Sequence, residues 1–384
     1  MKIGINGYYL FYPYSGIGQY SLQLLSGLSE IDKKNEYFIF SPQKVPFSLG
    51  ENFRFLVINP LSVLPNTFMN RYYWEEFQLS KAIKTYSLDF FHSLYPSLPS
   101  QAKKLPNLVT IHDVIPWIYP YYKNDLQYWI YLNLQKRNIL KRGKKIITDS
   151  KKSKEDIIKI YACDPGKIDV VYAAVDPIFS KKRDALHYEE LKVKYGISSS
   201  YVVYSGGFQK HKNIKNLFLS FKLFIEKYHY NGKLYILGGI RKNTAVSLSI
   251  YDGISELRKL TELLGISERV VFTGVISNEE YYLFMKMAEF FISLSFYEGF
   301  GMPALEAIST GTPCILSKNR VYEEIENGAA LYVNPQSINE ITHSMNKLLI
   351  DQNLKNDIRK KGFKRAKNFS RLKMAKEILE YYTG

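Results

Sequence analysis

The sequence predicts an α/β protein with two open, doubly wound domains whose sheets are mainly parallel. The chain has 384 residues, which is long for one ordinary core and enough for two. Short apolar runs alternate with stretches of helical periodicity, a pattern typical of parallel strands joined by helices. This alternation restarts near residue 200, after a charged segment that contains Pro177 and Gly196. Residues 1–176 are therefore predicted to form one domain, 177–199 a connection and 200–365 a second domain.

The strands are expected where short apolar runs occur, and the helices where apolar residues recur every three or four positions. In the first half, strands are expected at 2–6, 37–40, 55–58, 90–92, 108–111 and 145–148, with helices such as 19–28 and 72–84 between them. In the second half, strands are expected at 201–205, 233–237, 270–272, 290–294 and 313–316. Helices are expected there at 214–228, 254–264, 278–287 and 303–310.

Composition limits the class of protein. Lys and Arg number 52 against 36 Asp and Glu, so the net charge of +16 favours an anionic partner. Nucleic acid, anionic lipid and nucleotide phosphates all satisfy that charge. No uninterrupted apolar run reaches the roughly 18 residues that a membrane-spanning helix needs. Cys163 and Cys314 lack metal-ligand spacing, so no metal site is expected, and so few thiols fit a reducing cytoplasm.

The main chemical signal is a pair of glutamates around a glycine turn. An apolar strand ends near Ser295, a loop with two glycines follows, and Pro303 suits the first turn of a helix. Backbone N–H groups at 299–302 and the positive end of that helix can hold a diphosphate. The carboxylates of Glu298 and Glu306 can accept hydrogen bonds from the hydroxyls of a sugar and a ribose. Two glutamates at this spacing would by themselves be interpreted as solvated side chains. The strand, glycine loop and proline-started helix around them favour a ligand-binding site instead.

The segment 298–313 resembles the signature of family 4 glycosyltransferases, which have the GT-B fold. Other segments agree with that family in the same order along the chain: 14–20, 110–113, 147–150, 167–172, 204–207, 212–213, 272–274 and 328–335. The resemblance covers nearly the whole chain. It implies two Rossmann-like domains facing across a cleft, with a helix in 366–384 that crosses back to the first domain. It also implies a metal-independent, retaining transfer from a nucleotide sugar, without a cofactor.

The resemblance also assigns roles to individual residues. Glu298 would hold the hydroxyls of the transferred sugar, Glu306 would hold the ribose, and Lys212 would neutralise the departing phosphate. His112 follows the strand 108–111 and would lie beside the reacting sugar, where it could bond a hydroxyl or stabilise charge at the anomeric carbon. The expected catalytic residues are therefore His112, Lys212 and Glu298. The expected donor-binding residues are Gly16, Gly18, Gly207, Lys212, Thr273, Gly274, Glu298, Gly299, Phe300, Gly301, Met302 and Glu306. The family often has Arg where Gly207 and His211 stand, which leaves the details of the phosphate clamp open.

The segments 111–116 and 328–331 are most similar to mannosyltransferases of O-antigen and capsule assembly. GDP-mannose is therefore the expected donor, with UDP-glucose and dTDP-rhamnose types open, and a saccharide or lipid-linked saccharide is the expected acceptor. Aromatic and basic residues interleave over 117–152 and suit either an anionic membrane or a solvated basic face. A cytoplasmic enzyme is expected, free or peripheral on the inner membrane face. The alternatives are a nucleotide-sugar epimerase of the same fold and a basic nucleic-acid-binding protein; the latter lacks a recognisable binding module, so no nucleic-acid partner is expected.

Overall fold

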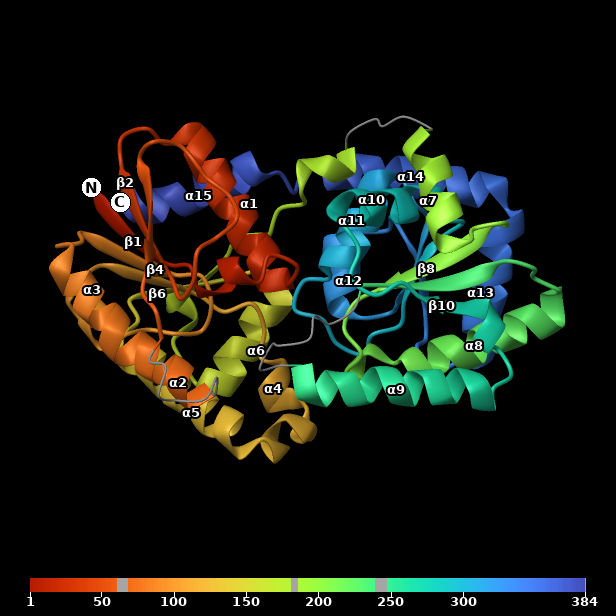
Figure 1. Ribbon diagram of the computed structural model, residues 1–384, viewed down its shortest axis with the longest axis horizontal. Helices are drawn as coiled ribbons and strands as arrows, with labels where there is room; N and C mark the ends of the chain where they lie inside the picture. Colours follow the sequence, from red (N-terminus) through yellow and green to blue (C-terminus); the bar gives the residue numbers. More distant parts are fainter. Residues whose placement is uncertain (61–67, 181–185, 239–246, 384) are drawn as a thin grey trace. The chain divides into compact units, whose positions relative to one another are not determined.

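The computed structural model describes residues 1–60, 68–180, 186–238 and 247–383 (Figure 1). Two compact units are present: Met1–Ala174 with Phe369–Gly384 form unit 1, and Val175–Asn368 form unit 2. Each unit contains one parallel sheet with helices around it, so the predicted two-domain α/β fold is confirmed. Within the described ranges, no helix combines the length and the apolar character needed to span a bilayer.

Unit 1 contains a seven-stranded sheet in the order β3-β2-β1-β4-β5-β6-β7, with all neighbours parallel. The strands are β1 (Lys2–Asn6), β2 (Glu36–Ser41), β3 (Phe53–Val57), β4 (Phe90–Ser93), β5 (Asn107–Thr110), β6 (Lys145–Thr148) and β7 (Ile168–Val170). Helices cover both faces of such a sheet, so its central strands are apolar almost throughout. Ile3 and Ile5 in β1 are accordingly fully buried. The six predicted strands are confirmed, and β7 was not predicted.

The helices of unit 1 include a widened, π-helical turn, η2 (Trp74–Leu79), between two α-helices. The α-helices are α1 (Gly16–Ile31), α2 (Phe68–Tyr73), α3 (Ser80–Thr85), α4 (Ile115–Ile118), α5 (Leu126–Arg142), α6 (Lys151–Tyr161) and α15 (Arg371–Thr383). Short 3-10 turns are η1 (Tyr8–Phe11), η3 (Ser100–Lys104), η4 (Pro120–Asn124) and η5 (Pro165–Lys167).

Helix α15 belongs to unit 1 although it is the last element of the chain. It packs against α1, at the opposite end of the sequence (Figure 1). The two helices meet at Gly27, where an added Cβ would lie 2.4 Å from the carbonyl oxygen of Arg371, so only glycine fits. Tyr382 also anchors the helix, because its hydroxyl lies 2.6 Å from Nδ1 of the buried His92 in β4.

Unit 2 contains a six-stranded parallel sheet in the order β10-β9-β8-β11-β12-β13. The strands are β8 (Tyr201–Ser205), β9 (Lys233–Leu237), β10 (Val270–Phe272), β11 (Phe291–Ser293), β12 (Cys314–Ser317) and β13 (Leu331–Val333). The α-helices are α7 (Leu186–Tyr195), α8 (Ile214–Tyr228), α9 (Ser247–Leu263), α10 (Asn278–Met287), α11 (Met302–Thr310), α12 (Arg320–Ile325), α13 (Ile338–Ile350) and α14 (Gln352–Ala366). Short turns are η6 (Pro177–Ser180), η7 (Lys210–Lys212) and η8 (Ser267–Arg269). The five predicted strands and four predicted helices are confirmed. Helix α7 lies in the segment expected to be a connection and packs against α10.

Strand order locates the binding edge of each sheet. In both units the direction of the crossovers reverses once: between β1 and β4 in unit 1, and between β8 and β11 in unit 2. At such a switch point the loops after the two central strands diverge, and ligands bind beyond the carboxyl ends of those strands. In unit 2 these loops are 206–213 and 294–301, which hold Lys212 and Glu298.

Candidate functional site

The switch point of unit 2 contains a buried ion pair. The ammonium group of Lys212 lies 2.9 and 2.8 Å from the two carboxylate oxygens of Glu298. The hydroxyl of Tyr322 donates to Glu298 Oε1 at 3.2 Å. Glu298 is only 9% exposed, so this pair is held away from bulk water. The two residues are 86 positions apart in the sequence, and the two loops of the switch point bring them together.

Glu298 is kept ionised by its neighbours. Burial alone would raise its pKa, but the charge of Lys212 and its hydrogen bonds outweigh burial and lower the pKa below the ordinary value. A buried carboxylate with one cation beside it is suited to accept hydrogen bonds from hydroxyl groups.

The glycine loop brings a helix end to the same place. Gly301 precedes α11 with φ +89°, and an added Cβ would lie 2.8 Å from the Tyr322 ring, so glycine is required twice over. Pro303 occupies the first turn of α11, and in the part of the chain that the structure describes the N-cap residue, Gly301, makes no side-chain cap hydrogen bond. An uncapped helix amino terminus attracts anions through its N–H groups and its dipole. Glu298, Gly299, Phe300, Gly301 and Met302 therefore lie together at this end of α11.

Glu306 lies in α11 in a different electrostatic state. It is 9% exposed and accepts a hydrogen bond of 2.8 Å from the hydroxyl of Tyr281. Burial raises its pKa to about 8, because the hydrogen bond from Tyr281 offsets only part of the desolvation, and Asp176 adds to the rise. Glu306 is therefore mostly protonated at neutral pH, unlike Glu298.

The remaining donor-side residues of unit 2 lie at the same edge of the sheet. Tyr204 donates a hydrogen bond of 2.7 Å to the carbonyl of Gly207, in the loop after β8. Thr273 and Gly274 follow β10, two strands from β8, and Gly274 has φ +71°. The backbone N–H of Gly238, after β9, donates to Thr273 Oγ1 at 3.3 Å. These residues share the carboxyl edge of the sheet with Lys212. The ion pair that joins two of the predicted site residues is the one between Lys212 and Glu298.

His112 and the first glycine loop lie in unit 1. Nδ1 of His112 lies 2.6 Å from Asp149 Oδ2, and Nε2 lies 2.9 Å from the carbonyl oxygen of Leu94. Both acceptors require a proton on the ring nitrogen that faces them. Burial lowers the pKa of His112, but Asp149 and the Leu94 carbonyl more than compensate, so the pKa is raised. With both nitrogens engaged, the imidazolium fits charge stabilisation better than a bond to a sugar hydroxyl.

Gly18 and Gly16 differ in what the backbone requires of them. An added Cβ at Gly18 would lie 2.1 Å from the carbonyl oxygen of Tyr12, so the turn into α1 needs glycine there. Gly16 has no atom within 4 Å of such a Cβ. Ser15 caps α1 by accepting from the N–H of Gly18 at 3.0 Å.

Sequence reasoning assigned no role to three side chains that complete these arrangements. Tyr322 and Tyr281 bond the two glutamates, and Asp149 orients and charges His112. Asp149 lies in the matched segment 147–150 and could have been found there, whereas the two tyrosines occupy helices without a local signal. Within the part of the chain that the structure describes, no cluster of three or more His, Cys, Asp or Glu side chains is placed to hold a metal ion.

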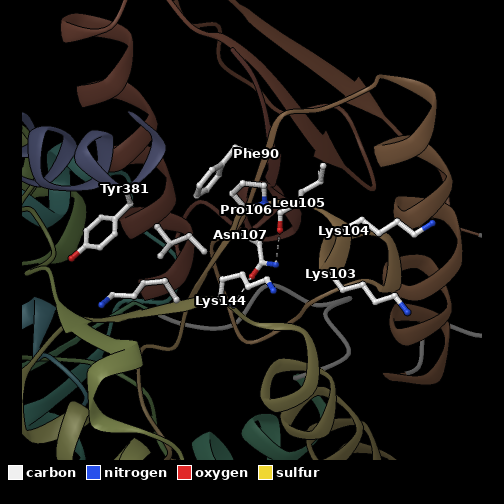
Figure 2. A pocket seen from close by; sticks show the side chains of 10 residues that line it. Phe90, Lys103, Lys104, Leu105, Pro106, Asn107, Lys144 and Tyr381 are labelled. Atoms are coloured by element: carbon white, nitrogen blue, oxygen red, sulfur yellow. Dashed lines mark hydrogen bonds between the residues drawn. The ribbon is translucent and has the colours of Figure 1, made fainter. Parts of the chain in front are cut away.

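A separate hollow of about 500 Å³ lies on unit 1, at the amino ends of β4, β5 and β6. It is therefore at the sheet edge opposite to His112. Figure 2 shows Lys103, Lys104 and Lys144 among the residues that line it, together with Phe90 and Tyr381. Lys145 also lines it and pairs with Asp169 at 2.7 Å. The lining combines cations with apolar surface and contains none of the predicted site residues.

Comparisons with known proteins agree with this arrangement. The model of Glycosyltransferase Family 4 matches residues 14–179, and the model of Glycosyl transferases group 1 matches residues 188–365. The O-antigen chain mannosyltransferase RfbU of Salmonella typhimurium is 26% identical over 332 residues, 84% of this chain and 83% of its own. O-antigen chain mannosyltransferase B of Escherichia coli is 24% identical over 380 residues, 94% of this chain and 93% of its own.

Solved structures share the fold. WaaG, a glycosyltransferase involved in lipopolysaccharide biosynthesis, superposes with a TM-score of 0.75 at 15% identity over 100% of both chains. Anabaena HepE in complex with UDP-glucose gives a TM-score of 0.76 at 15% identity, over 100% of this chain and 99% of HepE. At such identities the similarity concerns the fold alone, and that fold is GT-B.

Proposed function

Since the chain belongs to the GT-B glycosyltransferases of family 4, we propose that it moves a hexose from a nucleoside diphosphate sugar to a saccharide or lipid-linked saccharide. The transfer would proceed with retention, without a metal, in the synthesis of bacterial surface polysaccharide. The observation that carries this proposal is the Lys212–Glu298 pair at 2.8 Å beside the uncapped end of α11. One cation, one carboxylate and one anion-binding helix end match a diphosphate that is bonded to a sugar.

The chemistry assigns a task to each group. The diphosphate binds at the start of α11 with Lys212, and the hydroxyls of the sugar donate to Glu298. The bond between the anomeric carbon and the phosphate oxygen breaks, and Lys212 stabilises the charge that develops on that phosphate. The acceptor hydroxyl forms the new bond on the same face, and its proton passes to the departing phosphate. Glu306 holds the ribose, and Thr273 and Gly274 lie on the side of the nucleobase.

GDP-mannose is the proposed donor. Two relatives that align with most of this chain are O-antigen mannosyltransferases, which supports mannose and a polysaccharide acceptor. A structural neighbour binds UDP-glucose, so the nucleobase is a matter for direct measurement.

A thermal-shift series with GDP, UDP, dTDP and ADP tests the donor. GDP is expected to raise the melting temperature most, by roughly 5–10 °C at a hundred times its Kd, because a ligand that binds only the folded state stabilises it. Radiolabelled transfer from GDP-mannose to isolated surface-polysaccharide precursors then tests the reaction. A melting temperature that none of the four nucleotides raises would refute the donor site, and consumption of the nucleotide sugar without an acceptor would favour an epimerase.

We propose further that unit 1 binds an anionic membrane surface. Three exposed lysines line the hollow in Figure 2, and Leu126, Ile130 and Leu140 are 67%, 43% and 38% exposed along α5. Helix α5 ends at Arg142, two residues before Lys144, so the exposed Leu140 lies close to the cationic surface. Cations attract anionic headgroups, and exposed apolar side chains enter the interface.

Replacing Lys103, Lys104 and Lys144 together by Gln should weaken binding to vesicles that contain phosphatidylglycerol. Each lysine near such a surface contributes about 1 kcal/mol, so the loss should be on the order of 10²-fold in the partition coefficient. Co-sedimentation with vesicles of increasing anionic content measures it.

The matched control removes three exposed lysines from unit 2, as Lys215→Gln, Lys227→Gln and Lys259→Gln. It carries the same net charge as the first triple variant. Equal loss of vesicle binding in both triple variants would mean that net charge alone acts, and would contradict a membrane face on unit 1.

A further inference from the structure

A buried arginine in unit 1 is enclosed by tyrosine rings. The guanidinium carbon of Arg71, in α2, lies 4.6 Å from the ring centre of Tyr8 and 4.9 Å from that of Tyr9. It lies 4.4 Å from the ring centre of Tyr95 and 5.0 Å from that of Tyr131. Four aromatic faces at such distances stabilise a cation away from water. These five residues are called the Arg71 cage below.

The carboxylate of Glu75 forms hydrogen bonds with three members of the Arg71 cage, which are Arg71, Tyr95 and Tyr131. This carboxylate accepts from Arg71 Nε at 2.8 Å, from Tyr95 Oη at 2.6 Å, and from Gln135 Nε2 at 2.5 Å. Tyr131 Oη lies 3.0 and 3.1 Å from the two oxygens. The carboxylate is therefore fully bonded, and its side chain is 1% exposed. Glu75 belongs to the π-helical turn η2, a rare geometry that is found frequently at functional sites.

The cage lies at the switch point of unit 1. Asn6, the last residue of β1, donates to Ser93 Oγ, the last residue of β4, at 3.2 Å and to Tyr95 Oη at 2.9 Å. Tyr8 and Tyr9 follow β1 directly in η1. By the rule that located the Lys212–Glu298 pair in unit 2, this edge is where unit 1 binds a ligand.

Arg71 has hydrogen-bonding capacity that its surroundings do not use. Nε donates to Glu75, and Nη1 donates to Tyr9 Oη at 3.0 Å. A guanidinium has five N–H groups, and within the described residues Nη2 has no hydrogen-bond acceptor. The side chain is nine-tenths buried, with 10% exposed. Arg71 is thus held on one side by a carboxylate, while Nη2 on its other side meets no acceptor among the described residues.

We propose that the Arg71 cage binds an anionic group of the acceptor, either the phosphate of a lipid linkage or the carboxylate of an acidic sugar. The planar fork of a guanidinium matches both anions with two parallel hydrogen bonds. The half-buried ring of Tyr12 adjoins the cage at Tyr9 and provides a face for the neighbouring sugar. This inference rests on the proposed function, because it takes the ligand of unit 1 to be the acceptor.

The test is equilibrium binding to the full chain in saturating GDP, which occupies the donor site. The probes are a short-alkyl diphosphate-linked N-acetylglucosamine with methyl N-acetylglucosaminide as its neutral counterpart, and methyl glucuronide with methyl glucoside as its neutral counterpart. Calorimetry should show at least one anionic probe binding tenfold or more tightly than its neutral counterpart. The probe that shows the larger preference identifies the source of the anion.

The variant that tests the cage is Arg71→Met with Glu75→Gln. Removing both charges avoids an unpaired carboxylate in the interior, and the amide oxygen of Gln can still accept from Tyr95 and Tyr131. This variant should lose the anionic preference and keep wild-type GDP binding. The control is Arg142→Met with Glu76→Gln, which removes a neighbouring ion pair of 2.8 Å and should keep the preference. Arg71→Lys, which keeps the charge opposite Glu75 but loses the fork, should reduce the preference in a protein with a near-native melting temperature.

Equal affinity for anionic and neutral probes in the wild-type protein would overturn the proposal. So would an anionic preference that survives in the double variant, or in Arg71→Lys if the double variant does not fold. Failure of the donor proposal would appear separately, as absence of GDP binding, and the comparison of anionic with neutral probes does not depend on turnover.

Discussion

Glu298→Gln is expected to lower kcat by about 10²–10³-fold, the usual effect of removing one group that stabilises charge in a transition state. The amide keeps the size of the side chain and can still accept a hydrogen bond from Lys212. It loses the negative charge that holds Lys212 in place. It also loses one of the two carboxylate oxygens that accept hydrogen bonds from the sugar hydroxyls. Steady-state transfer at saturating donor, followed as release of nucleoside diphosphate, measures the loss.

The choice of Gln follows from the burial of the pair. Glu298→Ala would leave the Lys212 ammonium, whose side chain is 16% exposed, without a counter-charge. Breaking a buried pair in that way costs about 3–5 kcal/mol, which would confuse loss of folding with loss of catalysis. Glu226→Gln, on the exposed surface of α8, is the matched control and should retain full activity. Near-wild-type turnover in Glu298→Gln would exclude the role assigned to this carboxylate.

Nucleotide affinity is expected to rise with pH through the titration of Glu306. The free protein binds a proton on this carboxyl up to about pH 8, because burial raises its pKa. Ribose hydroxyls are donors and favour the ionised form, so binding must release the proton. Affinity is therefore low where the carboxyl is protonated, and it should increase roughly tenfold from pH 7 to pH 9. Calorimetry of GDP binding in buffers of different ionisation enthalpy measures both the affinity and the released proton.

Two variants separate Glu306 from other titrating groups. Glu306→Gln should remove the rise with pH and bind nucleotide about 10-fold or more weakly than wild type at pH 9, since a charged acceptor is worth about 1.5–3 kcal/mol. Tyr281→Phe removes the hydrogen bond that lowers the pKa of Glu306, so the rise should move to higher pH. Wild-type binding that does not change between pH 7 and pH 9 would show that the ribose does not meet this carboxyl.

Most of the secondary structure was predictable because it depends on local periodicity. The strands β1, β6, β8, β9 and β10 and the helices α8 and α10 begin and end where the sequence pattern predicts. Each has an apolar run or a helical stripe bounded by polar or glycine residues, which neighbours in the sequence determine. Strands β7 and β13 were not predicted.

The candidate site was predictable only in its residue types. The glycine turn between Glu298 and Glu306 is a local feature, and so is the proline that starts α11. The ion pair of Glu298 with Lys212 is not local, because it depends on two loops meeting at a switch point. His112 shows the same limit: its position after β5 was readable, while the bonds that engage both ring nitrogens come from Asp149 and Leu94.

By itself, the sequence determined the two-sheet architecture and the family, and it located the acidic pair. Tertiary structure alone decided that Glu298 is ionised while Glu306 is protonated, although both are glutamates that are 9% exposed. It also decided that Arg71 meets four tyrosines and that α15 packs on α1. The physical reason is that periodicity is carried by adjacent residues, whereas desolvation and charge pairing depend on atoms that only the folded chain brings within a few ångströms.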